Sequence, residues 1–141
     1  MSPAYEYRHI VTLQETNAVG NVYYTRHLEW QGRCREMFLR EHVPATLDLL
    51  QAGWSLVTVR CSCEYFAELF AFDEIAIRMR LASLTQNRVV MRFDYARFRQ
   101  GGEELVARGE QQVASMRRDG ERMTPAPFPP SMREALDRFS E

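Results

Sequence analysis

Residues 23–42, YYTRHLEWQGRCREMFLREH, predict one long helix. This stretch contains a single Gly and no Pro, and Pro44 disfavours helical geometry in the residue before it. A helical wheel gathers most of its apolar side chains in one arc, which we expect to face the core: Tyr24, Leu28, Cys34, Phe38 and Leu39. Charged residues occupy the opposite face, where we expect solvent.

Segments in which apolar and polar residues alternate surround this helix. One precedes it, at residues 5–13, and four follow it, at 54–66, 74–84, 88–99 and 103–116. A period of two is typical of half-buried strands, and the stretch 100–102 (QGG) favours a tight hairpin. Between the long helix and these strands we expect a short helix, with Pro44 in its first turn and Gly53 just after its end.

This order of elements predicts an α+β fold, in which an antiparallel sheet of about five strands wraps around one long helix. We expect residues 1–141 to form a single domain, because the sequence shows no internal repeat. Within it, residues 118–141 form a Pro-rich connector and a short C-terminal helix. A sheet of this kind leaves an edge and a face uncovered, so we expect a homo-oligomer, specifically a tetramer.

The composition argues against several classes of partner. Of the 141 residues, 45% are hydrophobic and 26% charged, as in an ordinary globular domain. The formal net charge of −1 lacks the basic excess of nucleic-acid-binding proteins. No apolar run long enough to span a membrane occurs, and Glu6 and Arg8 stand where a signal peptide needs apolar residues. We therefore expect a soluble, cytoplasmic protein that binds neither nucleic acid nor membrane.

The cysteines do not indicate a metal site. Cys61 and Cys63 form a C-x-C pair, but a structural zinc site needs about four ligands, and no second pair stands at ligand spacing. The sequence also lacks a glycine-rich phosphate-binding loop. We expect no metal and no organic cofactor.

Arg35 stands out because it falls within the apolar arc of the long helix. A buried guanidinium needs a carboxylate, a second subunit or a polar group of a ligand. A structural ion pair, or a side chain that reaches solvent at the helix edge, is an equally acceptable reading. His27 and Gln31 lie on the same side of the helix, and we consider them as lining of a pocket or of a subunit interface.

The loop before the helix, ETNAVGN at residues 15–21, has the residue types of a tight turn. Backbone N–H groups at the start of a helix lack partners, so those of residues 22–25 are candidates for an oxyanion hole. Asn17 lies near these donors. Without other information, an Asn in such a loop is more often a turn or capping residue.

The segment 15–30, ETNAVGNVYYTRHLEW, resembles the signature of the 4-hydroxybenzoyl-CoA thioesterase family, and the resemblance spans nearly the whole chain. It implies the hotdog fold and thioesterase activity. In that family an Asp that serves as nucleophile or general base occupies the place of Asn17. The string TNAVGNVYY followed by WQGRCREMFL resembles a narrower branch, the thioesterases that accompany iterative enediyne polyketide synthases, in which Asn is expected.

The narrower resemblance implies release of a β-keto polyene from an acyl carrier protein, with decarboxylation of the released acid. It carries Asn17 and Arg35 over as catalytic residues. In agreement with their chemistry, Asn17 donates to the thioester carbonyl, Arg35 polarises the ketone and thioester oxygens, and water is the nucleophile. An amide cannot act as a general base, so positioning replaces a strong base.

Three further residues are candidates for substrate binding: Tyr24, His27 and Thr58. Thr58 lies in the first strand after the helix, and strict alternation puts it on one face with Arg60, Ser62 and Glu64. The resemblance places part of the acyl tunnel near this strand. For the other three residues of the face, solvent or a subunit contact is the simpler interpretation.

Other functions remain open at this point. A housekeeping acyl-CoA thioesterase of the same fold would keep an Asp in place of Asn17. A non-catalytic acyl-ligand-binding hotdog domain belongs to regulators, but no helix-turn-helix accompanies this chain. A hotdog dehydratase needs a His and a carboxylate in its site, for which only His27 is suitably placed.

Overall fold

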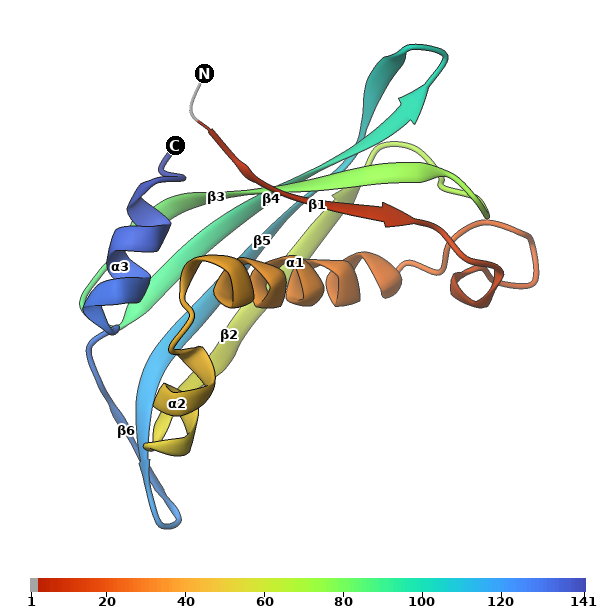
Figure 1. Cartoon of the computed structure of the whole chain (residues 1–141). Coiled ribbons are helices and arrows are strands. Elements are labelled where there is room, and N and C mark those ends of the chain that lie inside the picture. Colours follow the sequence, from red (N-terminus) through yellow and green to blue (C-terminus); the bar gives the residue numbers. More distant parts are fainter. Residues whose placement is uncertain (1–2) are drawn as a thin grey trace.

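The structure is a computed structural model that describes residues 3–141 (Figure 1). Its helices are α1 (Arg26–His42), α2 (Thr46–Gln51) and α3 (Pro130–Asp137), and a short 3-10 helix spans Leu13–Glu15. Its strands are β1 (Tyr5–Ile10), β2 (Trp54–Tyr65), β3 (Glu74–Leu84), β4 (Arg88–Arg99), β5 (Gly102–Asp119) and β6 (Arg122–Pro125). Among the described residues, no helix is both long and apolar enough to cross a membrane.

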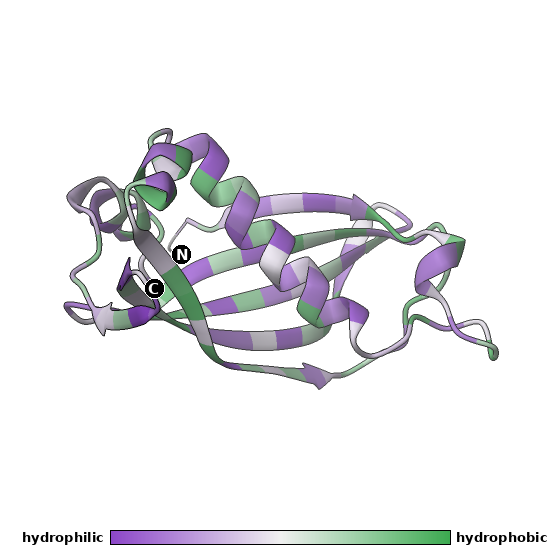
Figure 2. Cartoon of the chain, turned by 90° about the horizontal axis from the view of Figure 1, so that it is seen from below, coloured by the Kyte–Doolittle hydropathy of each residue, from purple (hydrophilic) through white to green (hydrophobic). Residues whose placement is uncertain are grey.

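The strands form one antiparallel sheet in the order β1-β3-β4-β5-β2, and β6 pairs with the end of β5. The sheet curls around α1, which lies against its concave face (Figures 1 and 2). This is the expected arrangement, and β3 and β4 have the predicted bounds. The hairpin between β4 and β5 is also confirmed, since Gln100 and Gly101 both have the positive φ of a tight turn.

Helix α1 begins at Arg26, three residues later than predicted, and this changes which residues face the core. Tyr24 lies before the helix and is 58% exposed, so its expected burial is wrong. Trp30 is fully buried in its place. The buried face of the helix consists of His27, Trp30, Gln31, Cys34, Phe38 and Leu39. The helix contacts β1, β2, β3 and β5, and Tyr95 of β4 donates a hydrogen bond to the carbonyl of His27.

A β-bulge interrupts β2. Thr58 pairs with Val113, and Arg60 pairs with the next residue, Gln112, so that Val59 has no partner of its own. Because directly paired residues share a face, Thr58 points to the concave side with the buried Val113. Arg60 points to the opposite side. The predicted common face of Thr58, Arg60, Ser62 and Glu64 is therefore wrong.

The C-terminal segment contains more structure than expected. Strand β6 lies within the Pro-rich connector and pairs with β5 across a two-residue turn that begins with Gly120 (φ 63). Helix α3 then buries Met132, Ala135 and Leu136 against the core. This segment closes the end of the sheet that is remote from the Asn17 loop (Figure 1).

Candidate active site

The loop around Asn17 is held by its own backbone. The N–H of Asn17 donates to the carbonyl of Asn21 at 2.8 Å, and the N–H of Gly20 donates to the carbonyl of Asn17 at 3.0 Å. The side-chain oxygen of Asn17 accepts the N–H of Val19 at 3.0 Å. Among the described residues, nothing accepts a hydrogen bond from Asn17 Nδ2. Asn17 thus uses its oxygen to shape the turn and keeps its amide NH₂ free to donate.

The backbone donors beside this loop are only partly free. The N–H of Val22 is bonded to the carbonyl of Leu69 at 2.8 Å, and that of Tyr23 to the carbonyl of Glu15 at 3.1 Å. The expectation that all four N–H groups of residues 22–25 point into the loop is therefore wrong for these two. Within residues 3–141, the N–H groups of Tyr24 and Thr25 have no acceptor. These two groups at the start of α1 are the donors left for an oxyanion.

Glu15 anchors the loop through a buried cluster that the sequence analysis missed. Its carboxylate accepts hydrogen bonds from Trp30 Nε1 at 2.8 Å, His9 Nε2 at 2.8 Å and the N–H of Thr12 at 2.9 Å. Burial by itself would raise the pKa of the Glu15 carboxyl, but these bonds outweigh it and lower the pKa to about 2. The Glu15 cluster (Glu15, Thr12, His9 and Trp30) ties the loop to β1 and α1.

Arg35 lies on the β2 side of α1. One of its terminal nitrogens donates to Gln111 Oε1 at 2.8 Å and approaches Thr58 Oγ1 at 3.5 Å. Its Nε is buried without a partner among the described residues. Burial lowers the pKa of the guanidinium, which Glu36 partly offsets. Arg35 also lines a pocket of about 580 Å³ between α1, α2 and β2, whose walls include Leu39, Leu47, Leu50 and Leu56.

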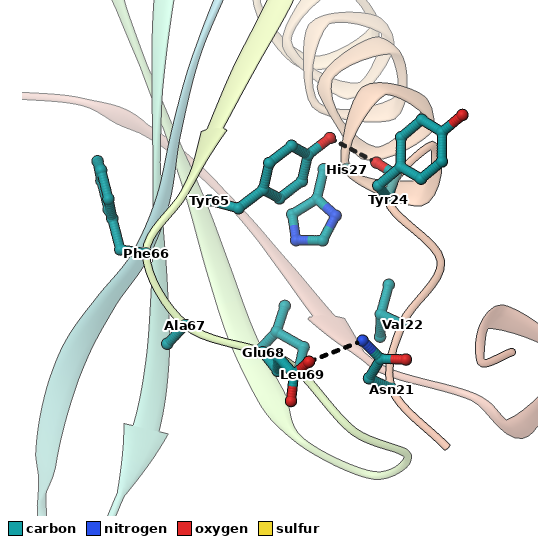
Figure 3. A pocket seen from close by; sticks show the side chains of 9 residues that line it. All are labelled: Asn21, Val22, Tyr24, His27, Tyr65, Phe66, Ala67, Glu68 and Leu69. Carbon is teal, nitrogen blue, oxygen red and sulfur yellow. Dashed lines mark hydrogen bonds between the residues drawn. The ribbon is translucent and has the colours of Figure 1, made fainter. Parts of the chain in front are cut away.

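A second pocket of about 300 Å³ lies between the start of α1 and the segment that follows β2 (Figure 3). We call it the His27 pocket, and its lining is Asn21, Val22, Tyr24, His27 and Tyr65–Leu69. His27 is only 4% exposed. Burial lowers its pKa to about 4, an effect that the nearby carbonyl of Tyr24 opposes in part, so the imidazole is neutral at pH 7.

His27, Gln31 and Arg35 follow one another at intervals of four residues and form a polar stripe along α1. Gln31 Nε2 donates to the carbonyl of Ser62 at 3.0 Å, while its Oε1 is buried without a partner. Gly109 lies directly under the Gln31 side chain, where a Cβ atom would collide with it. Each residue of the stripe therefore carries at least one buried polar atom that the described residues leave unpaired.

The predicted site residues fall into separate groups. Tyr24 and His27 line the same pocket, and Arg35 meets Thr58. Within residues 3–141, no hydrogen bond or ion pair joins Asn17 to Arg35. Arg35 lies nine residues into α1, which corresponds to about 14 Å of helix between it and the Asn17 loop. One chain does not bring the two together.

Asn21 and Gln111 are polar residues of these sites that the sequence analysis missed. Asn21 belongs to the quoted loop, but nothing in its spacing distinguished it from a turn residue. Gln111 was hidden inside an ordinary strand pattern, and an alternation of apolar residues interrupted by Gln111 and Gly109 is the signal that marks it.

Residues 11–136 match the family model of the thioesterase-like superfamily. The chain belongs to this superfamily. It is therefore a thioester hydrolase, and its curled sheet around one helix is the hotdog fold that the resemblance implied. A comparison with curated proteins gives no match. Among the described residues of this thioesterase, no group of three or more His, Cys, Asp and Glu side chains is arranged to hold a metal ion.

Solved structures agree with this assignment. A dynemicin thioesterase, described in terms of polyene binding, is 46% identical, with a TM-score of 0.94 over 98% of this chain and 98% of that one. A 1,4-dihydroxy-2-naphthoyl-CoA thioesterase from Synechocystis is 18% identical, with a TM-score of 0.84 over 95% and 96% of the two chains. The 4-hydroxybenzoyl-CoA thioesterase from Pseudomonas sp. strain CBS-3 is 19% identical, with a TM-score of 0.81 over 95% and 99%. The last two likenesses concern the fold alone.

Proposed function

We propose that this thioesterase releases a β-ketoacyl polyene from the acyl carrier protein of an iterative enediyne polyketide synthase in the cytoplasm, and that the released acid loses CO₂. The observation that carries the proposal is Asn17, an amide with a free NH₂ where the wider family has a carboxylate. The 46% identity to a dynemicin thioesterase, whose structure concerns polyene binding, supports the same substrate class.

In this reaction, water adds to the thioester carbonyl carbon, the C–S bond breaks, and the carrier thiol leaves with a proton from that water. A neighbouring keto group makes the carbonyl more electrophilic, which reduces the need for a strong base. Asn17 Nδ2 and the N–H groups of Tyr24 and Thr25 stabilise the oxyanion. The β-keto acid then loses CO₂, and a proton takes the place of the carboxyl group on the α-carbon.

Arg35 enters this site from a second copy of the chain. Strand β2 is an edge of the sheet, and its residues from Thr58 to Ser62 are exposed on both faces. Such an edge favours pairing with another strand, and Arg35 contacts Thr58 at this edge. We propose a homo-oligomer, specifically a tetramer of two dimers, in which Arg35 of one protomer polarises the substrate oxygens beside Asn17 of another.

Complementation between inactive variants tests this arrangement. Asn17→Ala and Arg35→Ala should each reduce release of a β-ketoacyl group from carrier protein by about a hundredfold, the scale of losing one oxyanion donor. If the two residues come from different protomers, unfolding and refolding an equal mixture should restore about a quarter of wild-type activity, because half of the dimers then contain one intact site.

Thiol release from carrier-protein and CoA thioesters, together with detection of the methyl ketone product, provides the measurement. Light scattering establishes whether the protein is a tetramer. A mixture that stays as inactive as its components would contradict the shared site, and a wild-type protein that cleaves only simple acyl-CoA esters would contradict the substrate class.

Asn17→Asp separates the donor mechanism from a general-base mechanism. An Asp keeps the side-chain oxygen that accepts the N–H of Val19, so the turn should persist. It lacks the NH₂ donor, and its charge repels the oxyanion and pairs with Arg35. We therefore expect about a hundredfold loss of kcat/KM. Wild-type turnover of the β-ketoacyl thioester by this variant would show that a carboxylate can serve as the base.

A further inference from the structure

The His27 pocket contains two side chains whose buried polar atoms are left without partners. Neither ring nitrogen of His27 makes a hydrogen bond to the described residues, and Asn21 Oδ1 is likewise buried and unpaired. Both residues line the pocket, and Figure 3 shows them at the edge of the same space, with the His27 ring near Tyr65 and Tyr24. Buried polar atoms are nearly always satisfied in folded proteins, so unpaired atoms around a pocket indicate a ligand.

The hydroxyl protons of the aromatic residues around His27 are not available to its ring nitrogens. The rings of Tyr65, Trp30 and Tyr95 have centroids 4.7, 5.0 and 5.5 Å from that of His27 and hold it in place. The hydroxyl of Tyr65 donates to the carbonyl of Tyr24 at 2.6 Å, and that of Tyr95 donates to the backbone carbonyl of His27 at 2.6 Å. Both hydroxyl protons are therefore committed to the backbone.

The orientation of the Asn21 amide is fixed by its neighbour. Asn21 Nδ2 donates to Glu68 Oε1 at 3.1 Å, and a carboxylate can only accept. The other atom of the amide, Oδ1, is thus a buried acceptor without a donor among the described residues. The neutral imidazole of His27 adds one N–H donor and one acceptor nitrogen.

We propose that the His27 pocket binds an oxygen function of the acyl group, with His27 and Asn21 as its hydrogen-bond partners. A ketone oxygen accepts from the His27 N–H, and a hydroxyl or enol also donates to Asn21 Oδ1. The apolar side chains of Val22 and Leu69 accommodate the adjoining carbon chain. The pocket thereby selects oxygenated acyl chains over plain hydrocarbon chains.

The position of the pocket indicates which oxygen it binds. A backbone hydrogen bond joins Asn17 to Asn21, which lines the pocket. One wall of the pocket therefore lies next to Asn17, the residue that we assign to the thioester carbonyl. The β-carbon is two bonds from that carbonyl carbon, so its oxygen is the first substrate oxygen beyond the thioester group. The inference thus rests on the proposed function, and it names the residues that would recognise the β-oxygen.

A titration of the histidine side chains tests binding without any turnover. The chain has three histidines, so the ring nitrogens of ¹⁵N-labelled protein can be assigned individually, with His9 and His42 as internal controls. Methyl pentyl ketone should shift the His27 nitrogen signals saturably and leave the other two unchanged. The isosteric alkene, in which a methylene group replaces the oxygen, should not. Unshifted His27 signals, or equal shifts with ketone and alkene, would overturn the proposal.

Substrate selectivity provides the second measurement. For two thioesters of equal chain length, one β-keto and one saturated, the ratio of kcat/KM values should fall about tenfold in His27→Phe and in Asn21→Ala. His42→Phe, about 22 Å further along α1, is the matched control and should keep the wild-type ratio. An unchanged ratio in both pocket variants would contradict the proposal. If wild type cleaves neither thioester, the proposed function fails, and the ketone titration still decides whether the pocket binds oxygen.

Discussion

The buried polar groups on the β1 side of helix α1 have hydrogen-bond partners, whereas several of those on the β2 side have none. On the β1 side, the Glu15 carboxylate is met by Trp30, His9 and Thr12. On the β2 side, His27 and Gln31 are buried and Arg35 is partly buried, yet each residue of this polar stripe retains an unpaired buried atom. The first group is complete within one chain. We infer that a substrate or another protomer completes the second.

Whether a buried polar group has all its hydrogen-bond partners distinguishes structural from functional residues better than its degree of burial does. A satisfied buried carboxylate contributes to stability, because its removal leaves several donors unpaired. Unpaired buried groups reduce stability and persist where they serve binding or catalysis. Substitutions on the β1 side should therefore affect mainly the free energy of unfolding, and those in the stripe mainly activity.

The largest effect on stability is expected at Glu15. Glu15→Ala should lower the free energy of unfolding by about 4 kcal/mol, because it leaves the buried donors of Trp30, His9 and Thr12 without an acceptor. Arg35→Ala, the matched change on the β2 side, should cost less than about 1 kcal/mol. Urea denaturation at pH 7 measures both. Equal losses of unfolding free energy in Glu15→Ala and Arg35→Ala would show that the two sides of the helix do not differ in this way.

As the pH falls, the protein should lose stability first through His27 on the β2 side and then, at lower pH, through Glu15 on the β1 side. His27 has a folded-state pKa of about 4, below its ordinary value of 6.5, so its unfolded form binds protons first as the pH falls. Stability should decrease by about 3 kcal/mol between pH 6.5 and pH 4. Glu15, whose pKa is lowered to about 2, adds its loss below pH 4.5.

Urea denaturation at several pH values follows this dependence. His27→Phe should remove the loss between pH 6.5 and pH 4.5 and retain the one at lower pH. If this variant keeps the wild-type profile above pH 4.5, another group must be responsible for it.

A loss smaller than those at Glu15 and His27 is expected at Gly109, under the polar stripe. Gly109→Ala should cost about 2 kcal/mol, because the new methyl group meets the side chain of Gln31 and the carbonyl of Ser62 at 2.9 Å. Part of that loss should be recovered with Gln31→Ala. Gly102→Ala on the same strand is the control, since its methyl group would meet only the carbonyl of Arg99, at 3.8 Å. Similar melting temperatures for both variants would show that Gln31 is not held in place by the strand.

Periodicity predicted the fold because it reports which face of each element is buried. It gave the bounds of β3 and β4 correctly, since large apolar residues recur at every second position through most of both strands, as at Ile75, Ile77 and Met79 or at Val89, Met91 and Phe93. It missed β6, although Asp119 and Gly120 are a recognised hairpin signal, because Pro-rich sequence suggested a connector. The wheel also misplaced Tyr24, since periodicity does not fix where a helix begins.

The candidate site was less predictable than the fold. The Asn17 loop and the partly buried position of Arg35 could be recognised from residue type and from the resemblance. The Glu15 cluster could not, because its contact with Trp30 depends on how α1 packs beside the loop and β1. For the same reason, the sequence could not show that the N–H groups of Val22 and Tyr23 already have partners. Their acceptors, the carbonyls of Leu69 and Glu15, belong to other segments of the chain.

The unpaired residue Val59 divides β2 into two stretches of opposite phase. Before it, even-numbered positions such as Thr58 face the helix, and after it odd-numbered positions such as Cys61 do so. Deleting Val59 would leave these pairings in place, because Thr58 and Arg60 would then be neighbours, as their partners Val113 and Gln112 already are. A single-residue deletion at Val59 should thus straighten the strand while the same side chains keep facing α1, so that the cost of losing this residue is confined to the local bend of the edge.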